Sequence, residues 1–104
     1  MFVAAIDVSE FGLRQAVCTT IGEQLILFIR QGEKFYAIDG VCPHKGAWMR
    51  DGIIDGNAIT CPWHDAQFDF RNGNGLNPMA SGGIRCWPTR VNDQVIEIDL
   101  GATE

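Results

Sequence analysis

Two short segments that each combine a cysteine with a histidine constrain this chain more than any other feature. The first is Cys42-Pro43-His44 and the second is Cys61-Pro62-Trp63-His64, with residues 45–60 between them. They contain both histidines of the sequence and two of its four cysteines. A thiolate and an imidazole one or two residues apart, present twice, supply donors that can converge on metal. The sequence therefore predicts a metal site with these ligands: Cys42, His44, Cys61 and His64.

The spacing C-x-H followed by C-x-x-H resembles the signature of Rieske proteins, whose [2Fe-2S] cluster has cysteine on one iron and histidine on the other. The resemblance extends to Lys45-Gly46 after the first histidine and to Gln67-Phe68-Asp69 after the second segment. It implies one Rieske-type [2Fe-2S] cluster as the cofactor. By the same resemblance, the two cysteines bind the buried iron and the two histidines bind the outer iron.

A structural zinc site is the main alternative, because two cysteines and two histidines also form a closed tetrahedral ligand set. Pairs of zinc ligands usually keep two or more residues between them, so the single residue between Cys42 and His44 favours donors to two metals. Two buried cysteine–histidine pairs without metal are a further alternative. The remaining cysteines, Cys18 and Cys86, are predicted to be small core or strand residues.

Length and charge favour a small carrier over a complete enzyme. A chain of 104 residues is expected to form one domain with a modest core, which a metal cluster that ties two loops together would help to stabilise. Its 13 acidic and 8 basic residues give a net charge of -5, which argues against nucleic acid and anionic membranes and favours partners with basic docking faces. The sequence shows no signal peptide and no apolar run of membrane-span length, so we expect a cytoplasmic protein.

Short apolar runs separated by tight-turn sequences predict an all-β fold. Asp7 is expected to cap one short helical turn, and the runs 25–29 and 35–38 are expected to form a hairpin that is buried on both faces. Further strands are expected at residues 2–6, 15–21, 52–54, 58–60 and 87–91, the last of these paired with 95–99. The resemblance implies a single domain, residues 1–104, with a Rieske-type β-sandwich and a small inserted cluster-binding subdomain of roughly residues 40–83.

One-electron transfer is the function that the resemblance implies. No catalytic acid and base, nucleophile or phosphate-binding loop can be assembled from the other residues, so we expect no enzymatic activity. The chain looks most like the freestanding Rieske ferredoxins of aromatic-ring oxygenase systems, which pass electrons from an NAD(P)H-dependent flavoprotein reductase to a terminal oxygenase. A monomeric carrier for a ring-hydroxylating dioxygenase of aromatic hydrocarbon catabolism is the first choice. The alternatives are a ferredoxin of a diiron toluene-type monooxygenase, a small subunit of nitrite reductase and, in a different class, a zinc-stabilised binding module.

In Rieske proteins the histidines reach the surface, and electrons enter and leave through that tip. The side chains expected around this tip are Lys45, Trp48, Met49, Trp63, Pro78 and Met79. Trp63 is expected to be exposed. Trp48 and Met49 fit either the exposed rim or the core beneath the first segment.

The reduction potential is expected near the low end of the Rieske range, at roughly -150 mV. High-potential Rieske proteins donate hydrogen bonds to the cluster sulfurs from a serine and a tyrosine, and this chain has Ala66 and Phe68 at those places. They also carry two extra cysteines that form a disulfide across the cluster, where this chain has Ala47 and Trp63.

Overall fold

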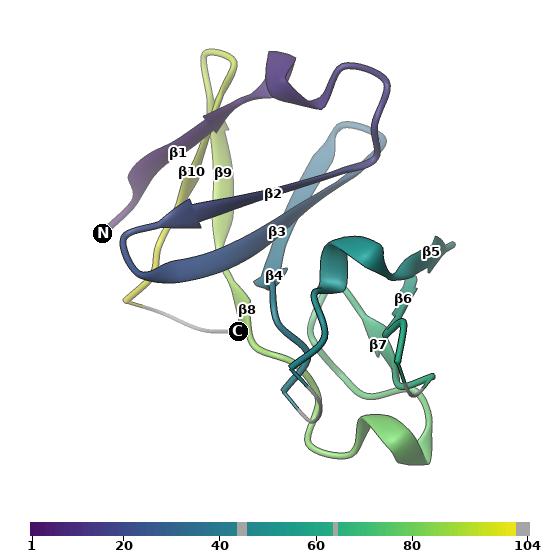
Figure 1. The fold of residues 1–104 in the computed structure, drawn as a ribbon. Coiled ribbons are helices and arrows are strands. Elements are labelled where there is room, and N and C mark those ends of the chain that lie inside the picture. The colour runs from purple at the N-terminus through teal and green to yellow at the C-terminus, as the bar shows by residue number, and fades with distance from the viewer. Residues whose placement is uncertain (44–45, 64, 102–104) are drawn as a thin grey trace.

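Strand-forming runs and turn residues alternate along the chain, and they fold into short antiparallel strands (Figure 1). The computed structural model describes residues 1–43, 46–63 and 65–101. Its elements are β1 (Val3–Asp7), η1 (Val8–Phe11), β2 (Ala16–Ile21), β3 (Gln24–Gln31), β4 (Lys34–Asp39), η2 (Met49–Asp51), β5 (Ile53–Asp55), β6 (Ala58–Thr60), β7 (Gln67–Asp69), η3 (Pro78–Ala80), β8 (Cys86–Trp87), β9 (Thr89–Asn92) and β10 (Val95–Ile98). The all-β prediction is confirmed.

The strands form three sheets, whose orders are β1-β10-β9, β2-β3-β4-β8 and β5-β6-β7. The first two sheets form the base, and the third lies beside them in Figure 1. Along the chain, the third sheet falls between β4 and β8 of the second. Gln31 at the end of β3 connects the base to this third sheet, because its Nε2 donates to Asn57 Oδ1 at 2.5 Å and to the Gly56 carbonyl at 3.4 Å.

The central strand β3 supplies alternate side chains to two separate cores, because successive side chains of a strand point to opposite faces. Ile26 and Phe28 lie in the base core, with Phe11, Ala37, Trp87, Ile96 and Ile98. Leu27 and Ile29 lie in a second core, with Ile38, Cys42, Ala47, Met49, Ile59, Cys61, Ala66, Phe68, Phe70, Ala80, Ile84 and Cys86. All four of these β3 side chains are fully buried. The predicted hairpin with two buried faces is therefore confirmed.

The predicted strand over residues 87–91 is wrong as a single element. Trp87 ends β8 and pairs with Ala37 of the second sheet, whereas Thr89 begins β9 and pairs with Ile98 of the first sheet. Pro88 lies between them and has no N–H to donate to a ladder, so the chain changes sheets at this residue. The predicted pairing with the last strand is confirmed for β9 and β10.

Helical structure in the described part of the chain is limited to short 3-10 turns. The turn predicted after Asp7 is present as η1, where the Asp7 carboxylate accepts a hydrogen bond from the Ser9 N–H at 2.9 Å. Within residues 1–43, 46–63 and 65–101, no helix has the length and the apolar character that crossing a membrane requires.

Candidate metal centre

The two predicted cysteine–histidine segments begin loops of equal length that are closed in the same way. Residues 42–47 lie between Val41 and Trp48, which form an antiparallel bridge. Residues 61–66 lie between Thr60 and Gln67, which pair in the same way between β6 and β7. In each loop the cysteine N–H donates to the carbonyl of the last residue at 2.8 Å, from Cys42 to Ala47 and from Cys61 to Ala66. Each segment therefore turns back on itself. We name these segments the first loop (42–47) and the second loop (61–66).

The conformation before the closing alanine is also the same in both loops. Gly46 has φ +71° in the first loop, and Asp65 has φ +59° in the second. The alanines that follow, Ala47 and Ala66, are fully buried, and Cys42 and Cys61 are each only 1% exposed. Because these four residues belong to the second core, both cysteines lie inside the protein and at equivalent loop positions. Two buried thiols in matching loops are an arrangement suited to holding one shared inorganic group.

The two histidines predicted as ligands, His44 and His64, lie outside the described residues, as does Lys45. The structure describes the positions of Cys42 and Cys61 only, and the assignment of all four residues as ligands remains a sequence prediction. Of the other cysteines, Cys86 is buried in the second core, and Cys18 of β2 is partly buried against it. Burial raises the pKa of the Cys18 thiol, so this thiol stays protonated at neutral pH. Both positions agree with the predicted role of small core or strand residues.

Exposed apolar side chains gather on the segments next to the two loops. Trp63 in the second loop is 69% exposed, as predicted, and Met79 in η3 is 52% exposed. Trp48 is exposed and its ring lies under the Arg50 guanidinium, whereas Met49 is fully buried. The two residues therefore divide between the rim and the core. Leu76, half exposed in the segment before η3, was missed because nothing in its local sequence separates it from a core leucine.

A third segment, residues 75–80, joins the second loop to the rest of the second core. The Leu76 N–H donates to the Gln67 carbonyl at 2.7 Å, and Gly75 forms a bridge with Phe68. A Cβ on Gly75 would come within 2.1 Å of the Ala80 carbonyl oxygen, so the segment packs on itself too tightly for any side chain there. We name residues 75–80 the third loop.

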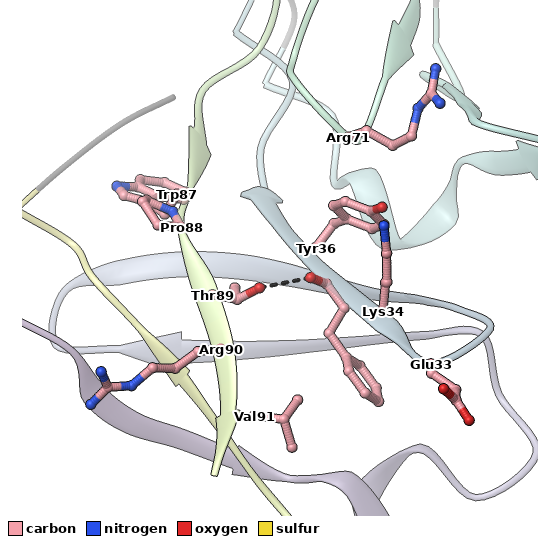
Figure 2. Close-up of a pocket in the computed structure, with 10 residues that line it drawn as sticks. Glu33, Lys34, Tyr36, Arg71, Trp87, Pro88, Thr89, Arg90 and Val91 are labelled. Carbon is pink, nitrogen blue, oxygen red and sulfur yellow. Dashed lines mark hydrogen bonds between the residues drawn. The ribbon is translucent and has the colours of Figure 1, made fainter.

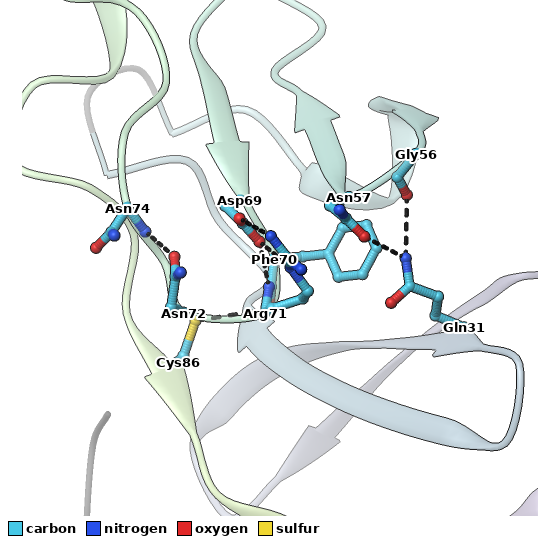
Figure 3. A network of polar contacts seen from close by, with 9 residues as sticks. All are labelled: Gln31, Gly56, Asn57, Asp69, Phe70, Arg71, Asn72, Asn74 and Cys86. Atoms are coloured by element: carbon cyan, nitrogen blue, oxygen red, sulfur yellow. Dashed lines mark hydrogen bonds and ion pairs between the residues drawn. The ribbon is translucent and has the colours of Figure 1, made fainter.

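The turn that leads into the third loop is organised by Asp69 at the end of β7 (Figure 3). Its carboxylate is nearly buried and accepts hydrogen bonds from Arg71 at 2.9 Å (N–H), 3.0 Å (Nε) and 2.8 Å (Nη2). The hydrogen bonds from the guanidinium lower the pKa of Asp69 below its ordinary value of 3.8. The Asp69 carbonyl accepts from the Gly73 N–H at 2.7 Å, so backbone and side chain of one residue fix the turn.

A groove of about 410 Å³ lies between β4 and β9, where the two strands diverge (Figure 2). Thr89 Oγ1 donates to the Phe35 carbonyl at 2.7 Å across the groove. The walls carry Lys34, Tyr36 and Arg71 on one side. Neither Cys42 nor Cys61, the two predicted ligands that the structure describes, lines this groove.

The family model for the Rieske [2Fe-2S] domain matches residues 1–88. This chain belongs to the Rieske [2Fe-2S] family. It is 37% identical, over 79% of its length and 78% of the relative's length, to the ferredoxin component of a naphthalene 1,2-dioxygenase system from Pseudomonas aeruginosa. The Rieske cofactor is one [2Fe-2S] cluster, and membership of the family decides for this cluster over the zinc site. The chain is a Rieske ferredoxin, an electron-transfer protein and not a catalyst.

Solved structures share this Rieske fold. The ferredoxin of carbazole 1,9a-dioxygenase from Nocardioides aromaticivorans IC177 has a TM-score of 0.85 at 21% identity, covering 94% of this chain and 96% of that one. A chain in the complex of reduced oxygenase and oxidized ferredoxin in carbazole 1,9a-dioxygenase also has a TM-score of 0.85, at 20% identity, covering 99% of this chain and 95% of that one. The predicted Rieske-type sandwich is confirmed.

Proposed function

We propose that this Rieske ferredoxin carries single electrons from an NAD(P)H-dependent flavoprotein reductase to the terminal oxygenase of an aromatic-ring-hydroxylating dioxygenase system. The similarity to the naphthalene dioxygenase ferredoxin over most of both chains is the observation that carries the proposal. The ferredoxin–oxygenase complex of carbazole 1,9a-dioxygenase, which contains a chain of the same fold, supports the oxygenase as the acceptor. We also propose that the carrier works in the cytoplasm, as a monomer.

We further propose that Cys42, His44, Cys61 and His64 hold the cluster. The equivalent backbone of the first and second loops supports a shared role, and so does the burial of both thiols in one core. The sequence contains no other histidine. When bound, the cluster accepts and releases one electron, and imidazole ligation makes it easier to reduce than a cluster with four thiolates. Both loops and all three strands of the third sheet fall within residues 40–83, which we propose as the cluster-binding subdomain.

Exposed apolar side chains near the two loops offer a surface that partner proteins can contact. Four exposed apolar side chains lie in the second and third loops or directly after the first loop, and we name them the apolar rim: Trp48, Trp63, Leu76 and Met79. Electron-transfer partners meet in small, transient interfaces, in which a few exposed aromatic side chains contribute most of the contact energy. We therefore propose that the rim contacts the reductase and the oxygenase.

Truncation of the most exposed rim side chain should slow electron transfer. With the reductase and terminal oxygenase of a naphthalene dioxygenase system, stopped-flow absorbance should show reduction of this ferredoxin and its reoxidation by the oxygenase. Trp63→Ala should lower both second-order rates by about tenfold, the factor for a contact of about 1.4 kcal/mol. Val91→Ala in β9 is the matched control, since Val91 is 47% exposed in the base, and its rates should match those of the wild type.

Two outcomes would contradict different parts of this proposal. A reduced wild-type protein that the oxygenase does not reoxidise rules out the proposed acceptor. Equal rates for Trp63→Ala and wild type, with the same visible spectrum, show that the rim is not the contact surface. A bleached Trp63→Ala variant shows instead that Trp63 holds the second loop.

The reduction potential should lie near the low end of the Rieske range, at roughly -150 mV. Ala66 and Phe68 are both fully buried in the second core beside Cys61, and neither carries a hydroxyl group. A hydroxyl that donates to a cluster sulfur stabilises the more negative, reduced state. Ala66→Ser and Phe68→Tyr should therefore raise the potential by on the order of 40 mV each, the one-electron equivalent of a hydrogen bond of about 1 kcal/mol. A wild-type potential well above zero in protein-film voltammetry would overturn the assignment to an oxygenase system.

A further inference from the structure

The side chain of Asn77 in the third loop makes two hydrogen bonds to the end of the second loop. Its Nδ2 donates to the Asp65 carbonyl at 2.8 Å, and its Oδ1 accepts from the Gln67 N–H at 3.2 Å. These two bonds lie on either side of Ala66, whose carbonyl accepts from the Cys61 N–H. One side chain from a separate segment thus holds the backbone that closes the second loop.

The Asn77 side chain makes these contacts and does not cap its own helical turn. It occupies the N-cap position of η3, where asparagine commonly accepts a hydrogen bond from the first turn of the helix. Here the side chain makes no such capping bond, and only the Asn77 carbonyl contacts the turn, accepting from the Ala80 N–H at 3.0 Å. The side chain is committed to the second loop and not to its own helical turn.

The second loop needs this support more than the first. Gly46 adopts its left-handed conformation without a steric cost, and its N–H donates to the Cys42 carbonyl at 3.0 Å inside the same loop. Asp65 holds the equivalent conformation with a side chain, which is unfavourable for an L-residue. The bond from Asn77 to the Asp65 carbonyl stabilises that conformation from outside the loop.

We propose that Asn77 is a positioning residue for the cluster: it fixes the Asp65–Gln67 backbone that directly follows His64 and thereby sets how firmly the second loop holds the metal. The inference rests on the proposed ligand set. Asn77 touches no reacting atom; it acts through the loop backbone. Removal of the Asn77 side chain should therefore change how firmly the cluster is retained and its electronic properties, and should change the stability of the base only slightly.

The test compares Asn77→Ala with a matched control in the purified holoprotein. In the control, Asn72→Ala, the lost side-chain bond is of the same kind: Asn72 Oδ1 accepts from the Asn74 N–H at 2.9 Å, outside both cluster loops (Figure 3). Loss of visible absorbance in the presence of an iron chelator should be about fivefold faster for Asn77→Ala, and its EPR spectrum and reduction potential should shift. Asn72→Ala should match the wild type in all three measurements.

A second variant keeps the proposal testable if Asn77→Ala yields no holoprotein. Asn77→Asp keeps the acceptor for the Gln67 N–H but has no group that donates to the Asp65 carbonyl at neutral pH. Its bleaching rate should lie between those of wild type and Asn77→Ala. Wild-type bleaching and EPR spectra in either Asn77 variant would overturn the proposal. A wild-type protein that contains no iron would instead refute the proposed ligand set, so the two failures are distinguishable.

Discussion

Replacing His44 or His64 by alanine is expected to leave the purified protein without its [2Fe-2S] cluster. Imidazole supplies half of the protein ligation in the proposed set, and alanine cannot coordinate iron. The wild type should contain two irons and two acid-labile sulfides per chain, whereas each variant should contain little of either. Iron and sulfide assays, the visible spectrum and the EPR spectrum of the reduced protein measure this outcome.

The remaining two cysteines provide the controls for this experiment. Cys18→Ser removes a thiol from β2, and Cys86→Ala removes one that packs in the second core near Gly73. Both variants should keep the full complement of iron, although Cys86→Ala should lower the free energy of unfolding by about 1 kcal/mol, since it removes a buried sulfur. Loss of the cluster in Cys18→Ser, or one zinc and no iron in the wild type, would refute the ligand assignment.

Gly73→Ala is expected to destabilise the protein by roughly 3 kcal/mol or more. Gly73 has φ +82°, and a Cβ there would lie 2.1 Å from the Ile84 carbonyl oxygen and 3.0 Å from Cys86 Sγ. The first contact is with backbone, which cannot rotate away as a side chain does. Gly73 and Ile84 are also joined by a backbone hydrogen bond, in which the Ile84 N–H donates to the Gly73 carbonyl at 2.8 Å. Urea unfolding followed by tryptophan fluorescence should show a large drop in the midpoint.

Gly82→Ala separates the steric clash from backbone strain. Gly82 has φ +88°, close to that of Gly73, but a Cβ there would meet nothing within 4 Å. The left-handed conformation alone costs a non-glycine residue about 1 kcal/mol, so this variant should lose about that much. If the two variants were equally destabilised, the close approach of Gly73 to Ile84 would not be the cause.

Much of this fold could be predicted because the signals were local. The continuous apolar run in β3 indicated two buried faces, and the short apolar runs predicted as strands at 52–54 and 58–60 correspond to β5 and β6. The ligand pattern could be read because donor spacing is a property of the chain and not of its packing. The all-β class and the Rieske family followed from these signals.

Features that depend on the arrangement of distant segments could not be predicted. Trp48 and Met49 are adjacent apolar residues, and which one faces the core depends on how this segment packs against the rest of the fold, where the Met49 N–H donates to the Gly40 carbonyl at 2.9 Å. The bonds of Asn77 go to residues of another loop, so no local pattern reveals them. The change of sheets at Pro88 could have been predicted from the sequence. A proline cannot donate a backbone hydrogen bond, so its presence argues against one continuous strand even where the residues around it alternate.

Since β3 supplies side chains to two cores, the base and the proposed cluster-binding subdomain both pack against this strand. Neither core can be dismantled without uncovering an apolar face of this strand, so we expect the two to melt in a single cooperative transition. A cofactor that binds only the folded state adds its binding energy to the stability of everything that unfolds with the site. We therefore expect a cluster bound by the proposed ligands of the first and second loops to stabilise the distant sheet β1-β10-β9 as well.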